Sequence, residues 1–346
     1  MNKLICVFLL LFSSSAGFAQ AAADKASREK TPEALAKRLT RGLSNDSLKV
    51  QAIFDWITGN LTYDLSVLDG NSLTSESQKA VRVMQTGKAV CQGYANLFYE
   101  LCQASGIPVS IIEGYCRFSP ENLKEYQLHA WNAVKVNGKW YVTDPTWGTG
   151  YIDMGKGGKY VREKNMAFFM TSPDKLLHTH LPFDPLWQFS YSPVSKDDFM
   201  SAAKKVANAP GKKTFSYPDT LQAYEKQDSA TRRLMAYRRM HAFDSTNEEP
   251  KVKLSYHYNR LAIGTMNKYS QTRNTLKTKE QLAGRRDELN LLLTQAEAYF
   301  GNSLKFTEGI SSKSFYFSNV TDNHQKIKSN LAVIKEERSF LKKNAN

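Results

Sequence analysis

The feature that most constrains this chain is the stretch from Gly87 to Trp147, in which a cysteine at a helix start precedes a β-hairpin. The stretch begins GKAVCQGYANLFYELCQASGIP and ends LHAWNAVKVNGKWYVTDPTW. The first part holds good helix formers up to a Gly-Ile-Pro stop, which predicts a helix. The last part contains Asn137-Gly138, the strongest short signal for a two-residue hairpin turn. We therefore expect a helix that begins near Cys91 and an antiparallel strand pair.

Cys91 is the candidate nucleophile. Cys91, Ala95, Phe98 and Cys102 recur at helical spacing, so Cys91 lies in the first turn of the stripe that faces the core. The first turn of a helix has N–H groups without helical partners and a partial positive charge. Both favour the thiolate, which is the reactive form of cysteine.

The hairpin register places a histidine beside an aspartate. If Val136 pairs with Lys139, His129 and Asp144 become diagonal neighbours on one face, about 7–8 Å apart, within reach of an imidazole and a carboxylate. We therefore expect Asp144 to orient His129. The same face carries an apolar set that is suited to receive the Cys91 helix: Trp131, Ala133, Trp140 and Val142. Contact between His129 and Cys91 requires the helix to pack on that face.

Five segments carry a resemblance to a known family. They are KVQAIFDWITGNLTYD from Lys49, GKAVCQGYA from Gly87, HAWNAV from His129, WYVTDPTW from Trp140 and HLPFDPLWQ from His180. Together they resemble the transglutaminase-like superfamily of papain-type thiol enzymes, and more narrowly the bacterial relatives of the kyphoscoliosis-peptidase branch. The resemblance covers residues 49–188, about half the chain. It implies that nucleophile, base and orienting acid are Cys91, His129 and Asp144.

Two glutamines are candidates for an oxyanion hole. Gln85 lies six residues before Cys91, the spacing at which papain-like enzymes place such a glutamine. Gln92 is the alternative, although on a helix it points away from Cys91. Either amide would donate to the developing oxyanion together with the backbone N–H of Cys91. A surface glutamine at a helix end explains each residue equally well.

The resemblance implies an α+β fold, with a papain-like core of helices packed on an antiparallel sheet and a C-terminal helical domain after it. It also implies hydrolysis of a peptide or other amide bond through a thioester acyl-enzyme, with a protein or peptide-like substrate and no cofactor. Two alternatives stay open. One is acyl transfer from protein glutamine to an amine, as in a transglutaminase, and the other is a non-catalytic interaction module.

His178 and His180 form an H-x-H pair. A metal site needs a third ligand, and the sequence offers none nearby, so we expect structural turn residues and no metal. Two polar segments flank the candidate site, residues 64–78 and the Gly- and Lys-rich residues 148–159. We expect the second segment to be a mobile loop that borders the cleft.

The N-terminus has the composition of a signal peptide over residues 1–19. Lys3 precedes an apolar run from Leu4 to Phe12, and small residues precede Gln20. The run is too short to span a bilayer. We expect cleavage after Ala19 and an exported bacterial protein, periplasmic or secreted, without a transmembrane segment in the mature chain.

After the signal peptide we expect a catalytic domain over residues 20–190, a linker over 191–216 and a helical domain over 217–346. The formal net charge is +14, and the residues after Ser190 hold 27 Lys and Arg against 16 Asp and Glu. This basic excess favours an anionic envelope component as partner of the helical domain, although solvated lysine faces explain it equally well. Export argues against nucleic acid.

The mature chain holds three cysteines. Cys91 and Cys102 are eleven residues apart on one helix, a rise of about 16 Å, so they cannot form a disulfide. A disulfide between Cys102 and Cys116 stays geometrically open. Both are more simply explained as free, buried, small apolar side chains. An odd count in an exported protein leaves one thiol over, as a reactive cysteine would require.

Overall fold

A computed structural model describes residues 29–69, 74–117, 126–153, 158–201, 215–314 and 316–344. These residues form two compact units. The first contains the described residues up to Phe183 and those of 187–212, and the second contains Asp184–Leu186 and the described residues from 213 onward. The predicted signal peptide, and residues 202–214 of the predicted linker, lie outside the described residues.

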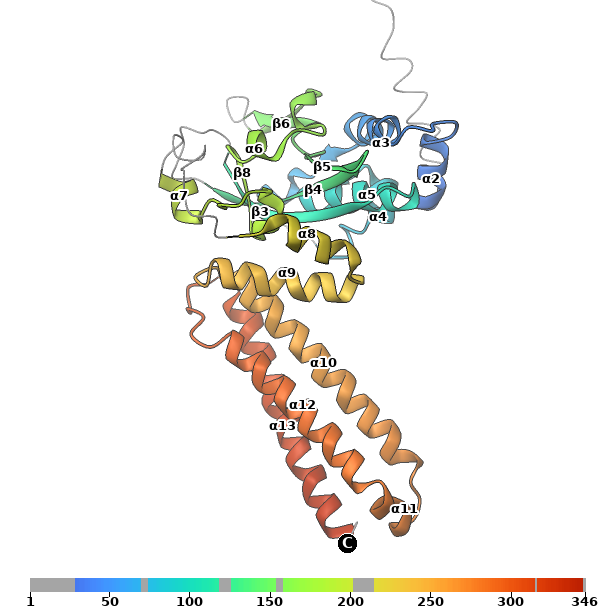
Figure 1. Ribbon diagram of the computed structural model, residues 1–346, viewed down its shortest axis with the longest axis vertical. Helices are drawn as coiled ribbons and strands as arrows, with labels where there is room; N and C mark the ends of the chain where they lie inside the picture. Colours follow the sequence, from blue (N-terminus) through green and yellow to red (C-terminus); the bar gives the residue numbers. More distant parts are fainter. Residues whose placement is uncertain are drawn as a thin grey trace, which may run out of the picture. The chain divides into compact units, whose positions relative to one another are not determined.

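The first unit is built on a four-stranded antiparallel sheet with the strand order β5-β4-β3-β8 (Figure 1). Its strands are β3 (Val109–Cys116), β4 (Gln127–Val136), β5 (Lys139–Thr143) and β8 (His180–Pro182). The strands β4 and β5 form the predicted hairpin, and Val136 pairs with Lys139 as predicted. Asn137 and Gly138 both have positive φ, 50° and 78°, which a two-residue turn of this hand requires.

Four helices provide most of the remaining core of this unit: α2 (Pro32–Leu39), α3 (Asp46–Asn60), α4 (Ala80–Thr86) and α5 (Cys91–Ala104). The side chain of Thr31 accepts a hydrogen bond at the start of α2. At the start of α3 the cap is Asn45, whose Oδ1 accepts from the N–H of Ser47 at 2.7 Å. Helices on an antiparallel sheet are the α+β architecture that the sequence predicted.

The helix α5 packs on the opposite face of β4 from the one expected. Asn132 Nδ2 donates to the carbonyl oxygen of Ala95 in α5 at 3.1 Å, and Val134 and Val136 share a core cluster with the buried side chains of α5. Trp131, on the other face, lines a small cavity with side chains that follow β7 in the chain, among them Leu176. Both faces of β4 are buried, so its apolar pattern could not tell which one receives α5.

The segment 148–159, which was expected to be a loop, contains parts of a second hairpin, and its residues 154–157 lie outside the described residues. The strands β6 (Gly150–Asp153) and β7 (Lys159–Arg162) pair with each other antiparallel. The pairing needs a glycine, because a Cβ on Gly150 would lie 2.1 Å from the carbonyl oxygen of Val161. Arg162 anchors the hairpin by donating to the carbonyl oxygen of Thr58 at 2.6 Å. A short parallel pair, β1 (Thr62–Tyr63) with β2 (Lys88–Ala89), leads into α5.

Five shorter elements complete the described part of this region: η1 (Leu65–Asp69), η3 (Met166–Phe168), α6 (Pro173–Leu176), η4 (Pro185–Gln188) and α7 (Lys196–Ser201). The element α6 lies between β7 and β8 in the chain. After α6 the chain returns to the sheet, where β8 pairs with β3.

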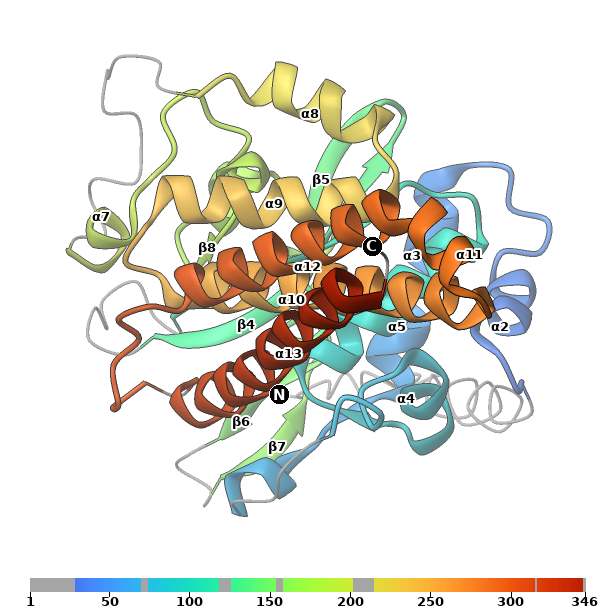
Figure 2. The same ribbon diagram turned by 90° about the horizontal axis from the view of Figure 1, so that it is seen from below.

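The second unit is helical. Its helices are α8 (Tyr217–Lys226), α9 (Ser229–Phe243), α10 (Glu248–Thr275), α11 (Lys279–Gly284), α12 (Arg286–Phe306) and α13 (Phe317–Asn344). The long helices α10, α12 and α13 lie side by side around one apolar core (Figures 1 and 2). Asp228 separates α8 from α9 by accepting from the N–H groups of Ala230 and Thr231. No helix in the described ranges combines the length and apolar composition that a bilayer crossing requires.

Candidate active site

Cys91 is the first residue of α5, as the sequence predicted. The preceding residue, Val90, has an extended backbone and no side-chain cap. Instead, Gln78 reaches the helix start, and its Oε1 accepts from the N–H of Val90 at 3.1 Å. The close approach depends on Gly93, because a Cβ there would lie 2.6 Å from that same oxygen. Gln78 therefore fixes the helix end that carries the thiol, a role that the sequence analysis did not find.

Asp144 directly follows β5 and is held by its own turn. Its Oδ1 accepts from the N–H groups of Thr146 at 2.8 Å and Trp147 at 3.2 Å. An aspartate commonly forms such a turn, called an Asx-turn, because its side chain accepts a hydrogen bond from the backbone N–H two residues further along the chain. The carboxylate is fully buried. One oxygen is thus occupied by the backbone, and Oδ2 remains for other side chains.

His129 lies between Asp144 and Cys91. Its Nε2 is 2.8 Å from Asp144 Oδ2, and the imidazole also forms a hydrogen bond with the Cys91 side chain. Since Nε2 faces the carboxylate, Nδ1 is the nitrogen left for the thiol. The Cys91 sulfur accepts a further hydrogen bond from the backbone of Ala130.

Contact between Cys91 and His129 therefore does not require α5 to pack on the face that carries His129, contrary to the expectation from sequence. The pairing of β4 with β5 ends at Asn132 and Thr143, and β4 continues for five residues beyond this point. The start of α5 meets β4 in this part, which pairs with β3 but lies beyond the end of β5. His129 reaches the thiol there although its side chain belongs to the other face.

The charges of the three side chains support one another. Burial would raise the pKa of the Cys91 thiol, but its hydrogen bond with His129 and the positive charge of that imidazole hold the pKa below its ordinary value. Burial would lower the pKa of His129, yet the charge and hydrogen bond of Asp144, with those of Cys91, raise it to about 10. Burial would raise the pKa of Asp144, yet His129 and His180 hold it well below its usual range. The arrangement favours a thiolate beside an imidazolium.

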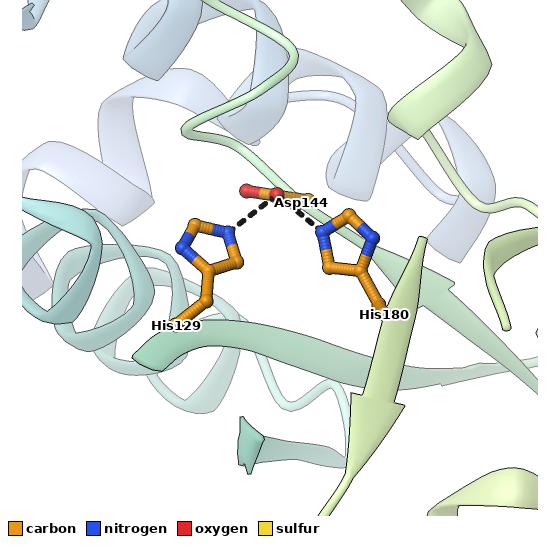
Figure 3. Close-up of side chains that lie close together, drawn as sticks. All are labelled: His129, Asp144 and His180. Atoms are coloured by element: carbon orange, nitrogen blue, oxygen red, sulfur yellow. Dashed lines mark hydrogen bonds and ion pairs between the residues drawn. The ribbon is translucent and has the colours of Figure 1, made fainter. Parts of the chain in front are cut away.

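A second histidine contacts the same carboxylate oxygen. His180 Nε2 lies 3.1 Å from Asp144 Oδ2, and His129 and His180 approach this oxygen from opposite sides (Figure 3). His180 is buried in β8, so the prediction of a turn residue is wrong for His180. His178 does lie in a turn. The sequence could not place His180, because only the pairing of β8 with β3 brings it to the site.

The three side chains His129, Asp144 and His180 form a cluster that could hold a metal ion by proximity alone, since their ligand atoms lie within 4.8 Å of one another. Their geometry is that of hydrogen bonds, however. Both Nε2 atoms are at donor distance from one shared oxygen, and a metal would require that both lose their protons. We therefore treat the cluster as a hydrogen-bonded network.

The two predicted oxyanion glutamines make contacts away from the thiol. Gln85 is exposed on α4, and its Oε1 accepts from Arg82 at 3.3 Å. Gln92 Nε2 donates to Asn96 Oδ1 at 2.9 Å. Tyr63, from β1, lies within electrostatic reach of the site: burial, followed by the charges of Cys91, Cys116 and Asp144, raises its pKa well above the usual range. Tyr63 therefore stays a protonated O–H donor at working pH.

Cys102 and Cys116 are both free and buried. Burial raises the pKa of each thiol, and for Cys116 the charges of Asp144 and Cys91 add to this effect. Cys91 differs from both because it is only half-buried and its pKa is lowered.

Residues 33–145 match the family model of the transglutaminase-like superfamily. The kyphoscoliosis peptidases of Mus musculus and Homo sapiens are each 30% identical to this chain over 169 residues, which is 48% of this chain and 25% of each relative. The Lim and transglutaminase domain protein ltd-1 of Caenorhabditis elegans is 25% identical over 175 residues, which is 46% of this chain and 24% of that protein.

This chain spans about a quarter of the length of the curated relatives that it matches. Among solved structures, the periplasmic domain of TgpA from Pseudomonas aeruginosa aligns with a TM-score of 0.27 and 20% sequence identity, over 37% of this chain and 48% of that chain. The matched family region contains Cys91, His129 and Asp144, and it ends before His180.

Proposed function

Because residues 33–145 form a domain of the transglutaminase-like superfamily, as the sequence resemblance predicted, we propose that this protein is a cysteine-dependent hydrolase of amide bonds. The observation that carries the proposal is the continuous chain of contacts from Cys91 through His129 to Asp144. It supplies a nucleophile, a base and an acid that orients the base. The name of the kyphoscoliosis peptidases supports a peptide-like substrate.

In the proposed reaction, the Cys91 thiolate attacks the carbonyl carbon of the amide, and the carbonyl oxygen takes the negative charge. His129, as imidazolium, gives its Nδ1 proton to the leaving amine when the C–N bond breaks. A thioester on Cys91 remains. Water then attacks the carbonyl carbon of the thioester and gives a proton to His129. The C–S bond breaks, which releases the carboxylic acid and restores the Cys91 thiolate beside the imidazolium. Asp144 holds Nε2 throughout and stabilises each imidazolium.

The oxyanion donors in this proposal come from the start of α5. The backbone N–H groups of Cys91 and Gln92 lie at the helix end that bears the thiol and precede every acceptor within the helix, whereas the N–H of Gly93 already donates to the carbonyl oxygen of Val90 at 2.9 Å. The Tyr63 hydroxyl is a further donor near the thiol. Gln92 and Gln85 remain candidates only if their present contacts with Asn96 and Arg82 break on substrate binding.

Two alternatives share the same domain. An amine instead of water at the thioester would make the protein a transglutaminase-type acyltransferase. A non-catalytic interaction module would need no reactive thiol, whereas the lowered pKa of Cys91 favours an enzyme. The signal-peptide composition of residues 1–19 supports an exported, periplasmic or secreted, protein whose mature N-terminus is Gln20.

The test is a digest of a peptide and glycopeptide library, read by mass spectrometry. We expect wild type to release new carboxyl and amino termini and Cys91→Ala to release none. Cys102→Ala is the matched control, because it removes a thiol from the same helix and should keep activity. Cleavage that persists in Cys91→Ala would refute the proposed nucleophile, and a reactive Cys91 without any cleavage would favour the interaction module.

We further propose that the second unit binds an anionic component of the envelope. The helices α9 and α10 carry Arg233, Arg238 and Arg260 close to His257, whose pKa is lowered by partial burial and then by these three charges. Replacing the three arginines by glutamine should weaken binding to dextran sulfate, and binding of wild type should weaken as salt rises.

The control for this binding test removes the same charge elsewhere. Three exposed lysines of α13, Lys326, Lys328 and Lys335, can be replaced by glutamine in the same way. Equal loss of binding in both variants would mean that net charge alone acts, and no loss in the arginine variant would refute the arginine site.

A further inference from the structure

We infer that His180 is a positioning residue of the candidate active site: as a neutral donor it holds Asp144 Oδ2 toward His129 and so keeps the Cys91 thiolate available. This inference rests on the proposed function, because it assigns a fourth side chain to that same site. The supporting observations are the hydrogen bonds on both nitrogens of His180, the complete set of donors on Asp144 and the packing around the imidazole.

The two nitrogens of His180 have different partners. Nε2 faces the Asp144 carboxylate at 3.1 Å, and Nδ1 faces the hydroxyl of Thr179 at 2.8 Å. A neutral imidazole donates from one nitrogen and accepts at the other. The carboxylate can only accept, so the proton belongs on Nε2 and the Thr179 hydroxyl donates to Nδ1. The alternative acceptor for that hydroxyl, the carbonyl oxygen of Leu176, is farther away at 3.3 Å.

His180 gives Asp144 its fourth hydrogen bond. Oδ1 accepts from two backbone N–H groups, and Oδ2 accepts from His129 and His180. A buried carboxylate is stabilised as the anion by such donors. Without His180, Oδ2 would depend on the one imidazole that must also take part in proton transfer. With His180 present, the carboxylate keeps its orientation and its charge while the proton of His129 Nδ1 moves.

Aromatic rings hold His180 in place. Trp147 packs edge-on against its imidazole with ring centroids 4.5 Å apart, and Trp131 does so at 5.1 Å. Trp131 lies across β3 because residue 114 is glycine, since a Cβ there would be 2.6 Å from the Trp131 ring. His180 is about 1% exposed, so bulk water does not compete for either nitrogen. Burial also disfavours its charged form.

The charges around this network fix the direction of the expected effect. Asp144 contacts two histidines, His129 on β4 and His180 on β8. Three further titratable groups interact electrostatically with this network: Cys91, Tyr63 and Cys116. Burial and the nearby His129 lower the pKa of His180, and Asp144 opposes this. The N–H of His180 stabilises the deprotonated form of the group of side chains that contains Asp144 and Cys91. Removal of this donor should therefore raise the pH at which Cys91 becomes a thiolate.

The first experiment measures alkylation of Cys91 by iodoacetamide between pH 4.5 and 9, which needs no substrate. In His180→Gln, the amide nitrogen can replace Nε2, so we expect alkylation close to wild type. In His180→Leu, which has no donor, the midpoint of the curve of alkylation rate against pH should move up by about one pH unit. At a pH below this midpoint, alkylation should therefore be about tenfold slower than in wild type. Thr179→Val should shift the midpoint in the same direction by less, and Thr179→Ser should not shift it.

These outcomes separate positioning from packing. A residue that only fills space would lower thermal stability in His180→Leu and leave the alkylation midpoint unchanged, and His180→Gln would not restore it. Either a folded His180→Leu with the wild-type midpoint, or a His180→Gln as slow as His180→Leu, would overturn the inference.

The second experiment uses the wild-type protein and keeps the inference testable even if the variants do not fold. Nitrogen-15 NMR of the imidazoles should find His180 neutral and protonated at Nε2 from pH 6 to 8. A proton on Nδ1, or an imidazolium at pH 7, would overturn the inference. Because this result is independent of catalysis, failure of the library digest with normal His180 signals would refute the proposed function and leave the hydrogen-bond assignment standing.

Discussion

Replacing Asp144 by asparagine removes one acceptor oxygen and one charge from a carboxylate that takes four hydrogen bonds. Two of these come from the backbone N–H groups of Thr146 and Trp147, and two from the Nε2 atoms of His129 and His180. An amide has only one acceptor oxygen. If this oxygen keeps the backbone pair, the NH₂ group faces both imidazoles. His129 must then carry its proton on Nδ1, the nitrogen that serves Cys91.

The expected loss affects both turnover and folding stability. The same exchange in a Ser-His-Asp enzyme lowers kcat about 10⁴-fold through the wrong tautomer, and we expect about 10³- to 10⁴-fold here. Removing one partner of a buried ion pair costs about 3–5 kcal/mol of folding stability. We expect the lower end, about 3 kcal/mol, since asparagine keeps the backbone bonds.

The stability difference should depend on pH. The pKa of His129 is raised to about 10, so its contribution is complete below the ordinary value of 6.5 and is lost as the pH rises toward 10. The pKa of Asp144 is lowered, so its contribution is complete above 3.8 and is lost as the pH falls below that value. Asp144→Asn should therefore be most destabilising between pH 3.8 and 6.5.

Two measurements check this prediction: iodoacetamide alkylation of Cys91 from pH 5 to 9, and urea unfolding over the same range. Asp55→Asn is the matched control, because it removes a carboxylate that is partly exposed and pairs with Lys164 at 2.6 Å in the same unit. The control should leave the alkylation rate unchanged. It should change the free energy of unfolding by no more than about 1 kcal/mol. A folded Asp144→Asn that is alkylated like wild type would refute the assignment of Asp144 as the acid that orients His129.

Three further predictions follow from the first unit. Iodoacetamide at mildly acidic pH should label Cys91 before Cys102 and Cys116, as peptide mapping would reveal, and faster labelling of either buried thiol would contradict the assigned nucleophile. Gly114→Ala should destabilise the unit by at least about 2 kcal/mol in urea unfolding, because its Cβ would lie 2.1 Å from a carbonyl oxygen of β8. The control Gly59→Ala has no atom within 4 Å of its Cβ, so it should change stability by less than about 1 kcal/mol. With a substrate and millimolar labelled cadaverine, free acid should exceed the amine adduct, since water is far more abundant than the amine and is the default second nucleophile at the thioester. A dominant adduct with negligible hydrolysis would assign the protein as a transferase.

The sequence by itself determined the local parts of the site. Asn137-Gly138 fixes the hairpin and its register. This register brings His129 near Asp144, with Nε2 of the histidine 2.8 Å from Oδ2 of the aspartate. The helix stop and the helical spacing place Cys91 at the start of α5. These features depend on turn geometry and on hydrogen bonds between near neighbours in the chain. Such interactions are strong enough to be predicted from a short segment.

Only the tertiary structure decided how these parts meet. Both faces of β4 are buried, so residue pattern could not show that α5 takes the face of Asn132, and not that of His129. Gln78 lies 12 residues before Val90 and His180 lies 36 residues after Asp144, and neither contact has a local signal. Each depends on where long-range packing puts a helix start or an edge strand. The physical reason is that polarity patterns specify which faces are buried, whereas steric fit among several elements selects the partner of each face.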